Sequence, residues 1–377
     1  MSNPGAPIPV FCVTDFWFPK FGGMERSIDN LCRGLPPDFQ PRICTPQPGG
    51  GPPDCPYPVS RFRADPVAGY YGGVLAEIER APAPRIVHVF GFSFRWPEAQ
   101  ARFIRAAAAV AGTAVVMKVP TQGDARNYLT TTHAGIAGSV DRFVALTGDL
   151  AGELSACGVS PERIAHLPNG VDTNRFLPAT GAQRAAARAP LALPPRRLVF
   201  GFCGRFEERK RVDLLAAAVR RQPDADRPIL LLIGETDRTF GAGVEIEGML
   251  DDDIRWVPPQ ADMRPLYRAL DVYATMSARE GMSNAVLEAI SSGLPVVASD
   301  IPGHRELVRH GEYGLLVEGG GTGELERAIA TVTGIWRSGR LPEWGEAARR
   351  ASLQFDMQAI CRRYAEMYRG LAAAPPS

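Results

Sequence analysis

The sequence has no excess of charge of either sign. Its 42 Lys and Arg residues nearly cancel its 41 Asp and Glu residues over 377 positions, which leaves a formal net charge of +1. Nucleic acids and anionic membrane surfaces attract proteins that carry a strong positive field. The sequence therefore predicts no nucleic-acid partner and gives no indication of peripheral membrane contact. An anionic ligand would have to be held by a local group of cations.

Long apolar runs and paired cysteine motifs are also missing. No stretch of 18 apolar residues could span a bilayer, and the N-terminal MSNPGAPIPVFCV has prolines and no basic region, unlike a secretory signal. The seven cysteines are odd in number, scattered and never in a C-x-x-C pair, which argues against a disulfide framework or a zinc ribbon. We expect a cytoplasmic protein with reduced thiols.

Short β-rich segments alternate with helical stretches along the chain. They are apolar on both faces, as are strands of a parallel sheet that helices cover on both sides. These segments are residues 8–14, 85–90, 114–119, 142–147, 197–204, 228–234, 253–257, 271–277, 295–300 and 314–317. Because the chain exceeds the roughly 250–300 residues that one hydrophobic core supports, the sequence predicts two doubly wound α/β domains.

A proline-rich stretch suggests where the domains meet. The segment LPATGAQRAAARAPLALPPR (177–196) contains four prolines and no clear periodicity beyond a short Ala/Arg helix. The predicted parts are an N-terminal domain, a linker, a C-terminal domain and a tail helix, over residues 1–178, 179–196, 197–356 and 357–377. The tail should pack on the body through one helical face, formed by Ile360, Tyr364, Met367 and Leu371.

Two glutamates lie eight residues apart in the segment REGMSNAVLEAISSGLPVVASD (279–300). Ser283 or Asn284 is a natural N-cap for the helix that follows, and the free N–H groups of its first turn can bind phosphate oxygens. Glu280 precedes this helix and Glu288 lies one turn inside it. Because a carboxylate can accept hydrogen bonds from a vicinal diol, the pair could hold two sugars of one phosphate ligand. The alternative is a capping carboxylate at 280 and a solvated helix residue at 288.

A second candidate is the segment GFCGRFEERKRVDLL (201–215), in which a strand and a turn at Gly204 are followed by Arg205 and Lys210. Two cations at the carboxyl end of a strand suit a diphosphate. A solvated charge run is the alternative, because further arginines adjoin Lys210. The third glycine of the dinucleotide fingerprint G-x-G-x-x-G is absent, which disfavours an oxidoreductase.

The first strand of the N-terminal half leads into the loop DFWFPKFGGMERSI (15–28). Gly22 and Gly23 precede a helix that should begin near Met24, and they would let a ligand approach the backbone closely. A plain tight turn is the alternative. The polar and aromatic residues expected on this side could stack on a sugar or a lipid carrier, and interdomain packing is the alternative. They are Asp15, Phe16, Trp17, Phe92 and Trp96, together with Tyr70 and Tyr71.

Taken together, these segments resemble the retaining GT-B glycosyltransferases of family 4. The matching stretches are FPKFGGME (18–25), LPNGVDTNRF (167–176), GRFEERKRVDLL (204–215), EGMSNAVLEAISSGLPVVASDIPGHRELV (280–308) and GEYGLLVE (311–318). The likeness extends from about residue 8 to residue 370. It implies a GT-B architecture, with two Rossmann-like domains that face each other across a cleft. The N-terminal domain would bind the acceptor, the C-terminal domain the nucleotide-sugar, and the last helix would return to the N-terminal domain.

The resemblance also implies roles for individual residues. Glu280 would lie near the hydroxyls of the donor sugar and Glu288 on the ribose, while Arg205 and Lys210 would stabilise the diphosphate leaving group. The remaining positions expected to bind the donor are Gly22, Gly23, Gly204, Gly281, Met282, Ser283 and Asn284.

The implied activity is transfer of a sugar from a nucleoside diphosphate sugar to a nucleophile on a sugar, lipid-carrier or natural-product acceptor, with retention of configuration. UDP is favoured over GDP, and a catalytically silent nucleotide-sugar-binding partner protein is the alternative. No metal or other cofactor is expected, because the cations at 205 and 210 would do its work. The D-x-D within residues 251–253 is interpreted as a surface turn. His304 and His310 are six apart, unlike the i, i+4 pair of a helical zinc site.

Lys118 marks a departure from the family pattern. Many members carry a histidine near the reacting end of the donor after the strand VVM, and the matching position in MKVPTQGD is this lysine. Lys118 is therefore a candidate catalytic cation in place of a histidine. The alternative is a lysine at a strand end, turned to solvent.

Overall fold

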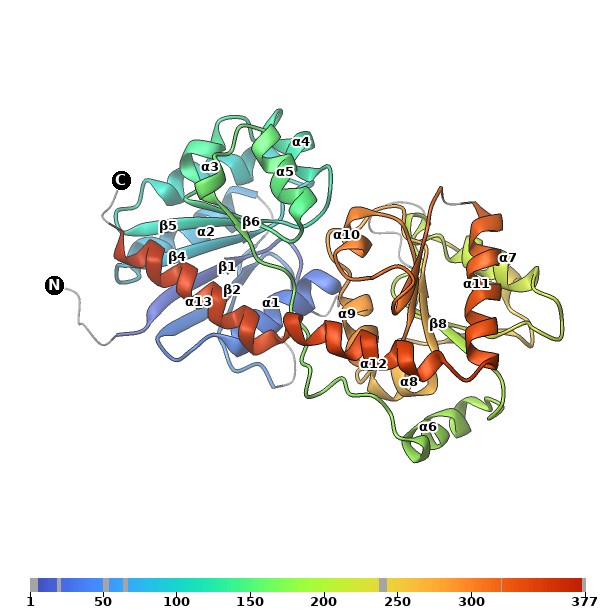
Figure 1. The fold of residues 1–377 in the computed structure, drawn as a ribbon. Helices are drawn as coiled ribbons and strands as arrows, with labels where there is room; N and C mark the ends of the chain where they lie inside the picture. The colour runs from blue at the N-terminus through green and yellow to red at the C-terminus, as the bar shows by residue number, and fades with distance from the viewer. Residues whose placement is uncertain are drawn as a thin grey trace. The chain divides into compact units, whose positions relative to one another are not determined.

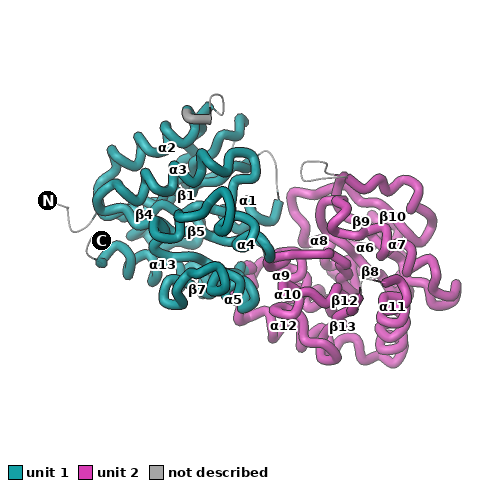
Figure 2. The backbone as a smooth tube through the Cα atoms, turned by 90° about the horizontal axis from the view of Figure 1, so that it is seen from above, with its two compact units in different colours: residues 1–170, 357–377 teal, residues 171–356 magenta. Residues whose placement is uncertain are grey.

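The computed structural model describes residues 6–18, 22–49, 54–63, 67–236, 243–319 and 321–374. The backbone divides into two compact units, residues 1–170 with 357–377 and residues 171–356 (Figure 2). Each unit contains one parallel sheet whose strands alternate with helices (Figure 1). The α/β class predicted from the sequence is confirmed, and all ten predicted strands are present.

In the first unit, the described strands form one parallel sheet in the order β3-β2-β1-β4-β5-β6-β7. They are β1 (Ile8–Val13), β2 (Phe39–Thr45), β3 (Val59–Arg61), β4 (Arg85–Phe90), β5 (Thr113–Val119), β6 (Arg142–Ala145) and β7 (Ile164–His166). The helices between them are α1 (Gly23–Gly34), α2 (Val67–Arg80), α3 (Pro97–Ala108), α4 (Asp124–Leu129) and α5 (Gly148–Ala156). The strand order reverses between β1 and β4, and ligands of open α/β sheets bind at such a point.

The last helix, α13 (Met357–Ala373), completes the core of the first unit and lies beside α1 (Figure 1). Of its four predicted apolar positions, Ile360 and Tyr364 are buried and the other two pack, partly buried, against the same core. Tyr368 is fully buried, and its hydroxyl lies 2.6 Å from Nδ1 of His88 on β4. The helix is therefore part of the first unit, although the whole of the second unit separates it from β7 in the sequence.

In the second unit, the described strands are all parallel in the order β10-β9-β8-β11-β12-β13. They are β8 (Val199–Cys203), β9 (Ile229–Ile233), β10 (Ile254–Val257), β11 (Val272–Thr275), β12 (Val296–Ser299) and β13 (Gly314–Val317). The helices are α6 (Gly181–Arg188), α7 (Val212–Arg220), α8 (Arg264–Ala269), α9 (Asn284–Ser291), α10 (Pro302–Arg305), α11 (Thr322–Arg337) and α12 (Leu341–Ser352). Here the order reverses between β8 and β11, so loops after these two strands are placed to bind a ligand.

The segment predicted as a linker belongs to the second unit. It begins with α6, whose N-terminus has a capping box formed by Thr180 and Gln183. At the other end of α6, Arg188 is buried and its Nη2 lies 2.6 Å from Oδ2 of Asp271, the residue before β11. This ion pair attaches the segment to the second sheet. The boundary between the units therefore lies at residues 170–171 and not near residue 178.

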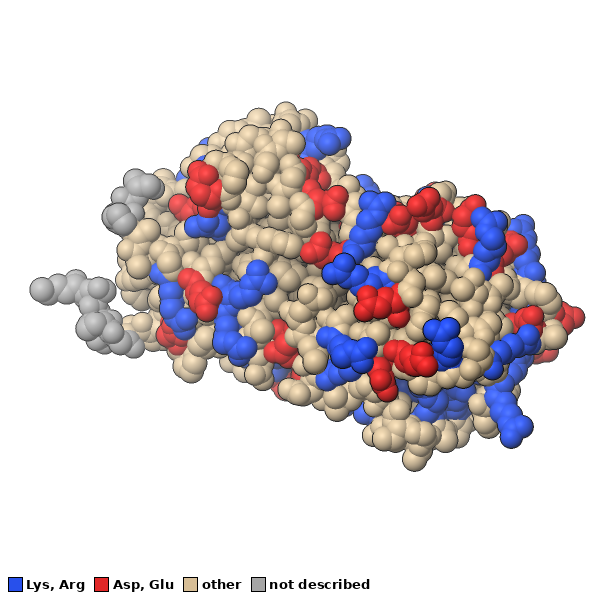
Figure 3. Space-filling model, in the orientation of Figure 1, with Lys and Arg blue, Asp and Glu red and all other residues tan. Residues whose placement is uncertain are grey.

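None of the helices that the structure describes is both long enough and apolar enough to cross a membrane. All seven cysteines lie in described segments and are free thiols. On the face drawn in Figure 3, Lys and Arg side chains are interspersed with Asp and Glu side chains, as the balanced composition predicts.

Candidate active site

Two loops meet at the point where the strand order of the second sheet reverses. One follows β8 and carries residues 204–211, and the other follows β11 and carries residues 276–283. Their backbones are joined directly, because the amide of Ala278 donates to the carbonyl oxygen of Arg209 at 2.7 Å. Three of the predicted charged residues, Arg205, Lys210 and Glu280, lie in these two loops, which the structure brings together.

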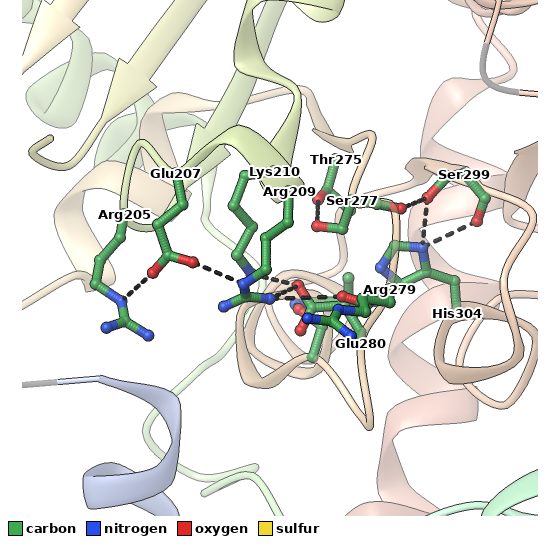
Figure 4. Close-up of polar contacts among 12 residues, drawn as sticks. Arg205, Glu207, Arg209, Lys210, Thr275, Ser277, Arg279, Glu280, Ser299 and His304 are labelled. Atoms are coloured by element: carbon green, nitrogen blue, oxygen red, sulfur yellow. Dashed lines mark hydrogen bonds and ion pairs between the residues drawn. The ribbon is translucent and has the colours of Figure 1, made fainter. Parts of the chain in front are cut away.

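A largely buried ion pair between Lys210 and Glu280 connects the loops (Figure 4). Nζ of Lys210 donates to Oε1 of Glu280, and Nη1 of Arg209 lies 3.5 Å from the same oxygen. The Lys210 and Glu280 side chains are only 15% and 12% exposed. Burial raises the pKa of Glu280, but the charges of Lys210 and Arg209 outweigh it and lower that pKa to about 2. The carboxylate is therefore ionised at neutral pH.

Glu207 is a buried carboxylate that the sequence analysis did not single out. Its Oε1 lies 3.0 Å from Nε of Arg205, and its Oε2 lies 2.6 Å from Nε of Arg209. Together with the ion pair between Lys210 and Glu280, the cluster contains three cations and two carboxylates. It therefore keeps a local excess of positive charge, which favours an anionic ligand. The charge run is thus an ordered network, and the alternative of a solvated run does not hold for Arg209 and Lys210.

The turn at Gly204 depends on a close contact with a second glycine. Gly204 and Gly234 have φ angles of +157° and +149°, in the region that glycine adopts most readily. A methyl group at Gly234 would lie 1.9 Å from the carbonyl oxygen of Gly204. The end of β9 therefore packs directly on the backbone that precedes Arg205, and a side chain at 234 would displace it.

The segment from Gly281 to the start of α9 has the local structure that the sequence predicts. Ser283 is the N-cap of α9, and its hydroxyl accepts a hydrogen bond from the amide of Val286. Asn284 is the first residue of the helix, and Met282 before the cap is buried. The N-terminus of α9 thus follows the Glu280 loop directly, where its amides can meet an anion.

Glu288 is buried inside α9, with 7% of its surface exposed. Its Oε2 accepts a hydrogen bond of 2.9 Å from the hydroxyl of Tyr267 on α8. Burial and the neighbouring Glu288 charge both raise the pKa of Tyr267, so the phenol keeps its proton as a donor. The alternative of a solvated helix residue is therefore wrong for Glu288. A carboxylate held in this way is available to orient a polar ligand.

Small polar residues and one histidine lie beside the Glu280 loop (Figure 4). Oγ of Ser299 donates to the carbonyl oxygen of Ser277 at 2.6 Å, and Nδ1 of His304 lies 2.9 Å from the carbonyl oxygen of Ser299. From the sequence, His304 was assessed only as a possible zinc ligand. The signal that could have found it is its position, five residues after a buried strand that ends at the same sheet edge.

In the first unit, the described part of the glycine loop also leads into a helix. Gly22 is the N-cap of α1, which begins at Gly23, one residue before the predicted start. Residues 19–21 of the same loop lie outside the described residues. The two glycines are thus at the carboxyl end of β1, next to the point where the strand order reverses.

Lys118 near the end of β5 is only 3% exposed. Its Nζ donates to Oγ of Ser27 on α1 at 2.8 Å and to Oδ1 of Asn169, after β7, at 2.9 Å. The ring of Phe90 lies 5.9 Å from the amine. Burial lowers the pKa of Lys118 to about 7. The alternative of a lysine turned to solvent is therefore wrong, and the amine instead links three elements of the first unit.

Asp15 occupies a hydrogen-bonded position at the end of β1. Its carboxylate accepts from Ser93 Oγ at 2.5 Å and from Tyr71 Oη at 3.2 Å. Burial raises the pKa of Asp15, and these two donors counteract the rise. Tyr70 is fully buried beside it, and its hydroxyl lies 3.1 Å from the carbonyl oxygens of Thr14, just after β1, and of Cys44 on β2.

The aromatic candidates of the first unit divide between core and surface. Trp17 is fully buried in the core, and Phe92 is buried with its ring stacked on Tyr128, 5.0 Å between centroids. Phe16 stacks on Phe94 at 5.6 Å, and 46% of Phe94 is exposed. Trp96, the N-cap of α3, is partly buried, with the Arg95 guanidinium 4.9 Å from its ring. The surface aromatics are thus Phe16, Phe94 and Trp96.

The aspartates at 251–253 are engaged in a turn before β10. Oδ1 of Asp251 accepts from the amides of Asp253 and Ile254, and its Oδ2 lies 3.0 Å from Nε of Arg220. Asp253 pairs with Arg197 at 2.7 Å. These contacts fit the interpretation of a surface turn. In the described segments, no group of three or more His, Cys, Asp or Glu side chains is arranged to hold a metal ion.

Two family models match the chain, one in each half. A model described as Glycosyltransferase Family 4 matches residues 21–175, and a model described as Glycosyl transferases group 1 matches residues 197–333. Between them they include more than half of the sequence and the segments that carry the site.

The chain is also similar in sequence to curated glycosyltransferases. The chain is 33% identical over 241 residues to a D-inositol 3-phosphate glycosyltransferase of Rhodococcus jostii, a match that includes 61% of this chain and 52% of the relative. A protein of the same name from Nocardia farcinica is 34% identical over 211 residues, 53% of this chain and 46% of the relative. The chain thus spans about half the length of the curated relatives it matches.

Solved structures share the fold over nearly the whole chain. Anabaena HepE in complex with UDP-glucose matches with a TM-score of 0.78 and 19% identity, over 96% of this chain and 100% of that one. Sucrose-phosphate synthase from Thermosynechococcus elongatus matches with a TM-score of 0.78 and 20% identity, over 97% and 99%. With its two parallel sheets, its ordered charged loops and both family matches, the chain belongs to the family 4 glycosyltransferases of GT-B fold.

Proposed function

We propose that the protein transfers a sugar from a nucleoside diphosphate sugar to an acceptor nucleophile, with retention of configuration at the transferred carbon. The observation that carries the proposal is the pairing of Glu280 with Lys210 at the sheet edge where the strand order reverses. A carboxylate and an excess of cations side by side suit a ligand that has both hydroxyls and a diphosphate. UDP is the favoured nucleotide, since HepE was solved with UDP and with UDP-glucose.

In the proposed reaction the bond between the sugar carbon and the phosphate oxygen breaks, and a bond to the acceptor oxygen forms on the same face. Negative charge develops on the departing diphosphate, where Arg205 and Lys210 would stabilise it. One such preorganised contact is worth roughly 2.7–4 kcal/mol, or about 10²–10³ in rate. The departing phosphate takes the proton of the acceptor, so the step requires no side-chain base.

We assign Glu280 to the hydroxyls of the donor sugar and Glu288 to the ribose. Each is held by a neighbour that fixes its carboxylate, Lys210 in one case and Tyr267 in the other. Preorganised acceptors of this kind lose little conformational freedom on binding. No metal is included, because the cations of the 204–211 loop supply the positive charge.

The proposal is tested by ligand-induced melting shifts and by release of nucleoside diphosphate. We expect UDP to stabilise the protein more than GDP, ADP or NAD, by about 2.7 kcal/mol when its concentration is about 100 times its Kd. UDP-glucose should then release UDP in the presence of a sugar or polyol phosphate acceptor, such as D-inositol 3-phosphate. Stabilisation without release from any donor and acceptor would favour the silent binding partner, and stabilisation by NAD alone would refute the proposal.

A further inference from the structure

His304 is a fully buried imidazole in α10, next to the loop of Glu280. Its Nδ1 lies 2.9 Å from the carbonyl oxygen of Ser299 and 3.2 Å from Oγ of the same residue. Because a carbonyl oxygen can only accept, Nδ1 carries the proton. Burial lowers the pKa of His304, against the effect of Glu280, and so favours the neutral ring. In this tautomer, Nε2 is a hydrogen-bond acceptor.

Nε2 of His304 has no hydrogen-bond partner within the segments that the structure describes. Native proteins satisfy nearly all buried polar atoms, because leaving one unpaired costs free energy. In Figure 4 this nitrogen lies on the side of the ring opposite Ser299 and is directed toward the loop of Glu280. A buried acceptor with this direction points to a donor supplied by a ligand.

The position of the imidazole beside Glu280 is fixed by a close backbone contact. A methyl group at Gly303 would lie 2.6 Å from the carbonyl oxygen of Gly281 and 2.8 Å from that of Glu280. The start of α10 therefore packs directly on the Glu280 loop. The negative charge of Glu280 raises the pKa of His304 against the larger effect of burial, as this packing leads one to expect.

We propose that Nε2 of His304 accepts a hydrogen bond from a hydroxyl of the donor sugar, beside the hydroxyls held by Glu280. This inference rests on the proposed function. Two neighbouring acceptors, one of them negatively charged, require a ligand that donates hydrogen bonds, and they repel a carboxylate or phosphate on the sugar. The site therefore selects a neutral sugar with a free hydroxyl at this position, and His304 is a specificity-determining residue.

Two substitutions distinguish this role from a structural one, in which His304 only donates a hydrogen bond to the carbonyl oxygen of Ser299. His304→Asn keeps an N–H donor for the carbonyl oxygen of Ser299 and removes the acceptor at Nε2. His304→Gln has a longer side chain whose amide oxygen can take the place of Nε2. His310, which is exposed in the same unit, provides the control variant His310→Asn.

The affinities of these variants for UDP and UDP-glucose can be measured by titration calorimetry. We expect His304→Asn to weaken UDP-glucose binding about tenfold, the effect of one lost hydrogen bond, and to leave UDP binding within about twofold. His304→Gln should regain most of the loss, and His310→Asn should match the wild type. Equal effects on UDP and UDP-glucose, or no effect on either, would overturn the proposal.

A second arm of the test combines His304→Asn with modified donors. One monodeoxy analogue of UDP-glucose, which lacks the hydroxyl that contacts His304, should bind the wild type about tenfold more weakly than UDP-glucose does. His304→Asn should bind this analogue as tightly as the wild type does. Equal losses in wild type and variant would overturn the role of His304 while leaving the proposed function intact. If the wild type binds UDP-glucose no more tightly than UDP, the assignment of His304 and Glu280 to the glucose hydroxyls is excluded. If the wild type binds neither ligand, the proposed function itself is refuted.

Discussion

Removing the amine of Lys210 should destabilise the second unit, because Glu280 would keep its charge in a buried site. The pKa of Glu280, about 2, lies about 2.5 below its ordinary value of 4.5. At about 1.4 kcal/mol for each pKa unit, this difference stabilises the fold by about 3 kcal/mol at neutral pH. Lys210 supplies the largest part of the charge effect that lowers this pKa, and Arg209 remains in the variant. Burial also lowers the pKa of Lys210 itself, which offsets part of the stabilisation. We therefore expect Lys210→Met to lose about 2 kcal/mol, or roughly 4–8 °C in Tm.

The pH dependence of this loss follows from the sign of the shift. The folded-state pKa of Glu280 is lower than the unfolded one, so its contribution is fully present above about pH 4.5 and is lost as the pH falls toward 2. The difference between wild type and Lys210→Met should therefore be largest near pH 7 and shrink by more than half by about pH 2.5. Urea unfolding followed by circular dichroism at several pH values measures it.

A double-mutant cycle isolates the ion pair. Lys210→Met combined with Glu280→Gln removes both charges, so it should be more stable than Lys210→Met alone. The exposed pair of Arg350 and Glu346 is a matched control, since its side chains are 69% and 76% exposed, and Arg350→Met should cost less than about 0.5 kcal/mol. Strictly additive losses in the cycle, or a loss independent of pH, would refute the reasoning.

Three further outcomes are expected. Lys118→Met should remove a pH dependence of the free energy of unfolding. The folded pKa of Lys118, about 7, lies below the unfolded value of 10.5, so wild-type stability rises between these pH values. In urea unfolding, the wild type should therefore gain about 3 kcal/mol relative to the variant from pH 7 to 9.5. Parallel pH profiles would contradict this. Arg205→Ala, at a side chain that is 28% exposed, should lower kcat about 10²-fold and lower the Tm less than Lys210→Met does, because Arg209 still pairs with Glu207. Turnover at the wild-type rate would remove Arg205 from the site. EDTA should leave the rate of UDP release unchanged, and a loss restored only by Mn²⁺ or Mg²⁺ would revive a metal site at residues 251–253.

The strands that the sequence predicts are those with a continuous apolar run. Buried parallel strands such as β9 (ILLLI) have this signature because helices cover both faces. The unpredicted β2 contains Pro41, which lacks an amide donor, yet it pairs in register with Val10 of β1. The other two, β3 and β7, have three residues each, too few for a periodic signal.

In the site, features that depend on neighbouring residues can be predicted from the sequence, and features that depend on contacts between distant residues cannot. The N-cap at Ser283 follows from its own neighbours and is confirmed. The inward direction of the Lys118 side chain cannot be predicted from its neighbours in the sequence, because its partners Ser27 and Asn169 lie 91 and 51 residues away. Glu207 lies in a charged loop without a repeating period, so nothing in the sequence indicates that it turns inward.

The central claim is that Glu280 and Glu288 hold the two sugars of one donor, and titration calorimetry with UDP and UDP-glucose tests it most directly. Glu288→Gln should weaken both ligands by about 10- to 100-fold, the worth of a charge-assisted hydrogen bond. Glu280→Gln should weaken UDP-glucose to a similar extent while UDP binds as tightly as before or more tightly, because Lys210 is released from its partner. Glu346→Gln, at an exposed position, should match the wild type. Wild-type affinity of Glu288→Gln for both ligands, or equal losses of UDP and UDP-glucose in Glu280→Gln, would contradict the account.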